Sequence, residues 1–218
     1  MTLRRSSDGL WQSPLLSSQN WLSHSFGTAE AAPADGFLVL HQVHGTQLVD
    51  ASEWHAHLSA DALATDTPAT RIAVKTADCV PILLADPVRK VVAAVHAGWR
   101  GTAAGIAARS VAAIGKRYGC RPADLLAAFG PSIGSCCFEV DPDAGQHFRA
   151  IFPDRNDLGR RTTVDLSEAN RRLLVQSGLD PSRIAHDAPC TCCGGAEFHS
   201  WRRDRAPGKR MFAVIGIL

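Results

Sequence analysis

The stretch that decides the fold is TADCVPILLADPVRKVVAAVHAGWRG, residues 76–101. It contains two short apolar runs, PILLA at 81–85 and KVVAAVH at 90–96, on either side of a polar segment with a proline. Two such runs around a short turn predict a pair of antiparallel strands. We therefore expect a β-hairpin near the middle of the chain.

The register of this hairpin connects two chemically reactive side chains. If Ala85 pairs with Lys90, the same register sets Cys79 opposite His96. Side chains directly opposed on one face of a ladder lie roughly 5 Å apart, which is within reach of a shared metal ion or of a thiol–imidazole contact. The hairpin therefore predicts that Cys79 and His96 meet.

Helical patterns follow the hairpin. From Gly98 the chain changes from strand to helix, with apolar residues at 106, 111 and 114 on one face and Gly119 as a stop signal. A second helix is predicted from Asp165, which can cap it, to Gly178.

Four further strands complete the expected architecture. They are predicted at 37–43, 71–75, 125–129 and 211–218. With no linker and no internal repeat, we expect one domain over residues 1–218 in the α+β class, with mixed β-sheets flanked by helices. The Ser-rich residues up to about 36 are expected to form an irregular lead-in.

Composition narrows the possible functions. The chain has 218 residues and a formal net charge of +2, which argues against a nucleic-acid-binding surface. No segment has the length and apolarity of a membrane span or a signal peptide. We expect a cytoplasmic protein without a nucleic-acid or membrane partner, and its oligomeric state stays open.

Seven cysteines form an odd set, which fits reduced thiols better than a disulfide framework. The run CTCC at 190–193 lacks a second C-x-x-C pair, so we interpret it as buried structural thiols. If GSCCFEV is a strand, Cys136 and Cys137 point to opposite faces, and we assign neither a role.

A third ligand candidate is His44, which follows a predicted strand and precedes Gly45. His41 is its rival. With Cys79 and His96, His44 makes a set of two imidazoles and one thiolate, the ligand number of catalytic zinc sites that keep one position open. These three residues are the predicted metal ligands and catalytic residues.

Basic residues near this set could bind phosphate. Arg100 lies at a predicted helix start among glycines, where backbone amides favour anions, although the glycines could equally serve a tight turn. The loop SWRRDRAPGKR at 200–210 is rich in arginine, and the sequence does not tell whether Arg202 or Arg203 points inward.

The motifs, taken in order, resemble one family. VHG at 43–45, TADCVPILLAD at 76–86, HAGWRG at 96–101, GPSIGSCCFEV at 130–140 and FHSWRRD at 198–204 are similar to the YfiH-like or laccase-domain family, also known as polyphenol oxidase and purine nucleoside phosphorylase. One departure concerns the opening segment of the family, where Ala29 in HSFGTAEA replaces an expected arginine and puts the substrate range in doubt.

The resemblance implies a layered YfiH-like fold and zinc on His44, Cys79 and His96. It also implies phosphorolysis of inosine, guanosine, adenosine and methylthioadenosine, deamination of adenosine, and therefore purine nucleosides and inorganic phosphate as ligands. Arg100 and Arg203 are the predicted substrate-binding residues, the latter through FHSWRRD.

Three alternatives stay open at this stage. Cys79 and His96 could form the nucleophile–base pair of a cysteine hydrolase acting on peptidoglycan-derived peptides. A copper polyphenol oxidase is disfavoured, because the histidine pattern does not supply a multicopper cluster. The last alternative is a metal-binding protein without enzymatic turnover.

Overall fold

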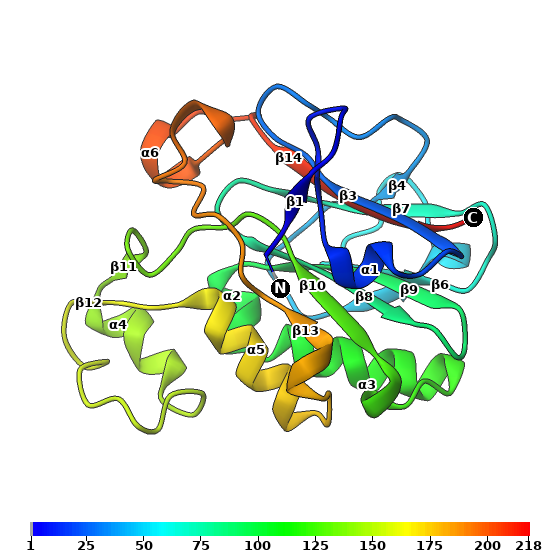
Figure 1. Cartoon of the computed structure of the whole chain (residues 1–218). Coiled ribbons are helices and arrows are strands. Elements are labelled where there is room, and N and C mark those ends of the chain that lie inside the picture. The colour runs from blue at the N-terminus through cyan, green and yellow to red at the C-terminus, as the bar shows by residue number, and fades with distance from the viewer. Residues whose placement is uncertain (1) are drawn as a thin grey trace.

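Two six-stranded sheets and a layer of helices form the molecule in the computed structural model, which describes residues 2–218 (Figure 1). The first sheet, in spatial order, contains β1 (Arg4–Arg5), β2 (Trp11–Gln12), β3 (Leu22–Phe26), β14 (Met211–Ile217), β7 (Arg71–Thr76) and β4 (Leu38–Val39). The second contains β13 (Ile184–Ala185), β10 (Leu126–Phe129), β8 (Val80–Asp86), β9 (Val91–Ala97), β6 (Ala62–Thr65) and β5 (Leu48–Asp50).

The remaining elements are a small ribbon and the helices. β11 (Glu139–Val140) pairs with β12 (Thr162–Thr163). The helices are α1 (Pro14–Ser17), α2 (Trp99–Ala103), α3 (Ile106–Tyr118), α4 (Pro142–Gly145), α5 (Leu166–Gln176) and α6 (Trp201–Asp204). Both sheets mix parallel and antiparallel pairs, so the predicted fold class is confirmed.

The second sheet is buried on both faces, which explains its continuous apolar strands. Along β8, Ile82 and Leu84 belong to the core beneath α3 and α5, whereas Leu83 belongs to the core shared with the first sheet. β9 alternates in the same way, and every residue of both strands is buried. The hairpin therefore forms the centre of the molecule.

The hairpin register differs from the prediction by two residues. His96 pairs with Pro81, and Asp86 pairs with Val91 across the turn. A shift of two residues keeps every side chain on its face, because strand side chains alternate with a period of two. Cys79 is therefore a diagonal rather than a direct neighbour of His96.

Other boundaries also differ from the predictions. The single helix expected after Gly98 is broken before Gly105, whose φ of 81° ends α2 and begins α3. The strand expected at 37–43 is reduced to β4 and an isolated bridge at His41. The lead-in expected to be irregular contains β1, β2, α1 and β3, and β3 pairs with β14 along five residues.

None of the helices that the structure describes combines the length and the apolar character needed to cross a membrane.

Candidate functional site

The loop after β4 and the ends of β8 and β9 bring the three predicted ligands together. The ligand atoms of His44, Cys79 and His96 all lie within 4.8 Å of one another. Cys79 Sγ is 3.9 Å from His44 Nε2, and the two imidazole rings have centroids 4.9 Å apart. His41 lines the neighbouring cavity without joining this group.

Backbone strain marks two of the segments that supply these side chains. His44 has a φ of 60°, and Asp78, just before Cys79, has a φ of 84°. Non-glycine residues rarely adopt positive φ, and such conformations persist only where surrounding contacts hold them. The turn at His44 is held by the carboxylate of Asp61. The turn at Asp78 is held by that residue's own carboxylate, which accepts from the Thr191 hydroxyl and the Arg202 amide.

Asp61, at the start of the segment leading into β6, is the carboxylate that holds His44. It is fully buried. Its Oδ1 accepts the backbone N–H of His44 at 2.9 Å, and its Oδ2 accepts that of Gly45 at 2.7 Å and that of Val43 at 3.3 Å. One side chain thus fixes the whole turn that presents the first imidazole.

The same carboxylate orients His96. Nδ1 of His96 lies 2.8 Å from Asp61 Oδ1, and because a carboxylate only accepts, Nδ1 carries the proton and donates it. In the neutral imidazole the lone pair is then on Nε2, which can act as a ligand, the carboxylate–histidine arrangement found around protein-bound metals. Asp61 was not predicted as a site residue. Its position directly before the strand ALAT was the one feature of the sequence that could have pointed to it.

Charge interactions perturb the titration of this group. Burial disfavours the charged forms of both residues, but the His96 imidazolium lowers the pKa of Cys79, while the Cys79 thiolate and Asp61 raise the pKa of His96. Asp61 is also desolvated, yet its bonds to His96 and to backbone amides lower its pKa. The thiolate is therefore the favoured form of Cys79.

Glycines of HAGWRG allow these segments to approach closely. A Cβ on Gly98 would lie 2.7 Å from His44 Cδ2 and 3.1 Å from Cys79 Sγ. One on Gly101 would lie 2.9 Å from the carbonyl oxygen of Gly45. Both glycines thus serve packing around the ligand group.

A cavity of about 570 Å³ opens at the three predicted ligands, which are among the residues that line it. Trp99, Phe138 and Trp201 give it aromatic walls. Among the described residues that line it, one is acidic, Asp78, and five carry a basic side chain: Lys75, Arg100, Arg202, Arg205 and Arg210. Such a surface suits a planar ligand that carries or is accompanied by negative charge.

The two predicted substrate arginines have different positions. Arg100 lines the cavity and stacks on Trp99, with 4.4 Å from its guanidinium carbon to the ring centroid. Arg203 lies outside the lining: its guanidinium donates to the carbonyls of Thr191, Cys192 and Phe198 and to its neighbour Asp204. Its neighbour Arg202 lines the cavity in its place.

The expectation that the CTCC cysteines are buried is wrong, because Cys190 and Cys192 are half-buried and Cys193 is exposed. The sulfurs of Cys190 and Cys193 form a close group with those of Cys136 and Cys137, and both Cys136 and Cys193 are exposed. The segment GSCC is a turn rather than a strand, which lets two successive cysteines point the same way.

Fold and site together define an α+β protein with a His–Cys–His centre in a cationic, aromatic cavity. The chain belongs to the family described as multi-copper polyphenol oxidoreductase laccase, which matches residues 19–218. The family resemblance seen in the motifs is thereby confirmed.

Relatives in this family carry other names. The chain is 42% identical to the purine nucleoside phosphorylase of Deinococcus radiodurans over 84% of this chain and 71% of that protein. It is 38% identical to adenosine deaminase RL5 from an unknown prokaryotic organism, over 77% and 66% of the two chains. Among solved structures, Bacillus licheniformis YfiH superposes with a TM-score of 0.88 at 28% identity, covering 99% of both chains.

Proposed function

We propose that the protein is a zinc-dependent purine nucleoside phosphorylase, acting on inosine, guanosine, adenosine and methylthioadenosine, that also deaminates adenosine. One observation carries the proposal: the ligand group, the aromatic walls and the basic side chains line a single cavity. The names of the relatives support both activities.

The donor set fits zinc. Two imidazoles and one thiolate are ligands that zinc accepts in catalytic sites, and Asp61 leaves the Nε2 lone pair of His96 available. His44, Cys79 and His96 would hold the ion. When bound, zinc supplies Lewis-acid chemistry.

The ligand groups in the structure match a multicopper oxidase less well than a zinc enzyme. A multicopper oxidase needs further histidine-bound copper beyond one His₂Cys site. Within residues 2–218, groups of three or more side chains that could bind a metal occur at two places. One is the His–Cys–His group, and the other contains four cysteines and no histidine.

The residues around the ligands have complementary roles in this proposal. Trp99, Phe138 and Trp201 stack on the purine, and Arg100 and Arg202 bind the phosphate dianion. In phosphorolysis a phosphate oxygen bonds to C1′ as the C1′–N9 bond breaks, and the purine leaves with the bonding electrons and takes up a proton. In deamination, water attacks C6 of adenosine and ammonia leaves.

Product analysis tests the reaction. We expect inosine and phosphate to give hypoxanthine and ribose 1-phosphate, with no turnover when phosphate is omitted. Arg202→Ala should raise the KM for phosphate at least tenfold at unchanged zinc content, because the arginine faces the cavity and is not a ligand. Arg160→Ala, an exposed arginine outside the cavity, is the matched control. Free ribose formed equally fast without phosphate would exclude phosphorolysis.

A cysteine hydrolase is the second candidate, favoured by the 3.9 Å between Cys79 Sγ and His44 Nε2 and by the low pKa of the thiol. It would act on peptidoglycan-derived peptides. Hydrolysis of such a peptide by metal-free protein, abolished by alkylation of Cys79, would favour this candidate over the zinc enzyme.

A further inference from the structure

We propose that Cys136, Cys137, Cys190 and Cys193 form a second metal site, a tetrathiolate that holds one zinc ion and joins two loops of the chain. This second site shares no ligand with the His–Cys–His group. The proposal can therefore be tested independently of the function proposed above.

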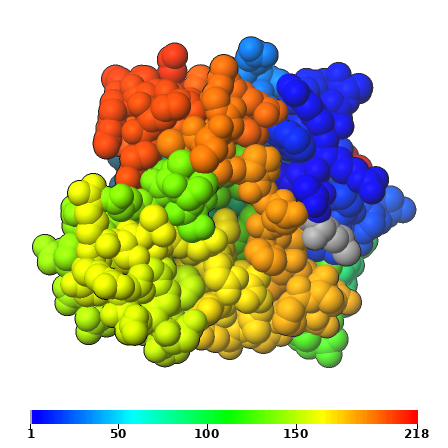
Figure 2. Space-filling model, turned by 60° about the vertical axis from the view of Figure 1, so that its left-hand side comes forward, coloured from blue at the N-terminus to red at the C-terminus, as the bar shows by residue number. Residues whose placement is uncertain are grey.

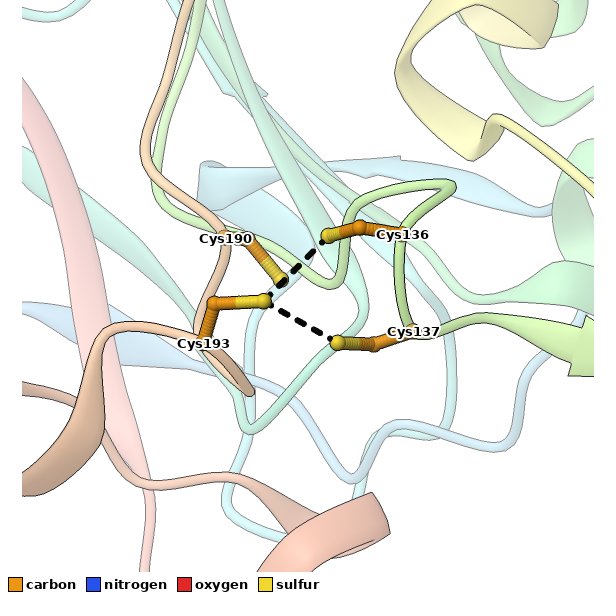
Figure 3. A group of neighbouring side chains, drawn as sticks. All are labelled: Cys136, Cys137, Cys190 and Cys193. Carbon is orange, nitrogen blue, oxygen red and sulfur yellow. Dashed lines mark hydrogen bonds between the residues drawn. The ribbon is translucent and has the colours of Figure 1, made fainter.

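The sulfur positions fit a single tetrahedral ion. All four sulfurs lie within 4.8 Å of one another, and that of Cys193 is 3.4 Å from that of Cys136 and 3.2 Å from that of Cys137 (Figure 3). A Zn–S bond of ~2.3 Å in tetrahedral geometry separates the sulfurs by about 3.8 Å. A disulfide needs ~2.05 Å, and Cys193, near two sulfurs at once, could bond to only one of them.

Two turns present the sulfurs as pairs. In the first loop, the amides of Cys137 and Phe138 donate to the carbonyl of Gly134, so that Cys136 and Cys137 both face the second loop. There the amide of Gly194 donates to the carbonyl of Cys190 at 2.8 Å, which closes a turn around the Cys190-Thr-Cys-Cys193 sequence. C-x-x-C turns of this kind are common zinc ligands.

Hydrogen bonds around the sulfurs match those of protein metal sites. The amide of Gly134 donates to Cys190 Sγ at 3.2 Å, and such amide donors stabilise a thiolate that binds a metal. Arg203 contributes as well, since its guanidinium binds the carbonyls of Thr191 and Cys192. This gives the arginine of FHSWRRD a positioning role for the second loop.

The two loops are distant in sequence and adjacent in space. Figure 2 shows the green segment near residue 135 against the orange segment near residue 190 on one face of the molecule. Backbone bonds join Ser132 to Pro189 and to Thr191. A metal bound by one pair of sulfurs from each loop would lock this junction.

The junction also leads to the ligand Cys79. Thr191, between two of the cysteines, donates through its hydroxyl to Asp78 Oδ1 at 2.6 Å, and the amide of Ile133 donates to the carbonyl of Asp78 at 2.9 Å. Asp78 is the residue at positive φ that presents Cys79. The second site therefore supports one wall of the cavity from outside.

Metal analysis of the full chain, purified under reducing conditions with zinc, tests the proposal. We expect Cys193→Ser and His96→Ala each to lose about one zinc per chain relative to the unmodified protein. Cys192→Ser should lose none, because Cys192 does not belong to the group of four sulfurs. Equal zinc in Cys193→Ser and the unmodified protein overturns the proposal, as does bound iron with inorganic sulfide.

A measurement on the unmodified protein covers the case in which Cys193→Ser does not fold. Cys136 and Cys193 are exposed, so they should react rapidly with iodoacetamide unless a metal protects them. We expect peptide mass spectrometry to find at least tenfold slower alkylation of both with zinc than after chelation. Equal alkylation rates, or a Cys–Cys cross-link in the untreated protein, would contradict the tetrathiolate.

Discussion

Replacing Asp61 by asparagine should weaken both the fold and the proposed metal centre. Asparagine keeps one acceptor oxygen but turns the other into a donor. We assume that the amide oxygen of the asparagine keeps the bonds to His96 and His44. The new NH₂ group then faces the amides of Gly45 and Val43, which in the unmodified protein lie 2.7 and 3.3 Å from Oδ2. Two partly buried donors lose their acceptor, which costs about 1–2 kcal/mol each, so we expect a loss of about 2–4 kcal/mol in the free energy of unfolding.

Urea denaturation and zinc competition against a chelator measure the two effects. A lost carboxylate partner of a ligating histidine reduces metal affinity by roughly 10–100-fold. Asp86→Asn is the matched control, because Asp86 is also buried and accepts two turn amides, from Val88 and Arg89, far from the ligands. Both amides bond to Oδ1, an acceptor that asparagine keeps, so Asp86→Asn should cost less stability than Asp61→Asn and leave zinc affinity unchanged. A folded Asp61→Asn protein with normal zinc affinity would refute our reasoning.

Three other perturbations give distinct readouts. Gly98→Ala should reduce zinc content while far-ultraviolet circular dichroism stays native, since its Cβ would stand 2.7 Å from an atom of His44; full zinc content would contradict this close packing. Burial lowers the pKa of His24 from 6.5 to about 4, and the Ser13 amide donates to His24 Nε2, a bond that only the neutral imidazole can accept. The unfolded chain therefore binds a proton first as the pH falls. This contribution to stability is complete above about pH 7, is reduced by about 2 kcal/mol at pH 5 and by about 3 kcal/mol at pH 4. Denaturation of His24→Gln should show a shallower fall, and an identical slope would exclude His24 as a source. Trp201→Ala should raise the KM for inosine with a stability change within about 0.5 kcal/mol, because the ring is 43% exposed beside the cavity; an unchanged KM would remove Trp201 from the purine site.

The central hairpin and the ligand group were predictable because their signals are local. Apolar runs around a proline turn define β8 and β9, and a period of two kept Cys79 and His96 on one face despite the shifted register. Asp61 could not be found in this way, since its partners come from segments that only the folded sheet brings together. A search for an aspartate or glutamate that accepts a hydrogen bond from a ligating histidine would have reduced the number of residues to consider for this role.

Elements that depend on distant partners escaped prediction. β3 has the polar sequence LSHSF and gains its place by pairing with β14, almost the full chain length away. The same holds for the four cysteines: as a strand, GSCC would separate Cys136 from Cys137, whereas the turn closed at Gly134 brings both to Cys193. Local pattern does not distinguish these two conformations.

The pairing of β3 with β14 also has a consequence during protein synthesis. β3 ends at Phe26, and its partner begins only at Met211. At ~5–20 residues per second, the ribosome needs roughly 10–40 s to make the intervening chain. Until β14 is made, β3, and β7 once it has been synthesised, lack the strand that pairs with both of them, and open strand edges can pair with other chains. The centre of the first sheet can therefore close only after β14 has been synthesised.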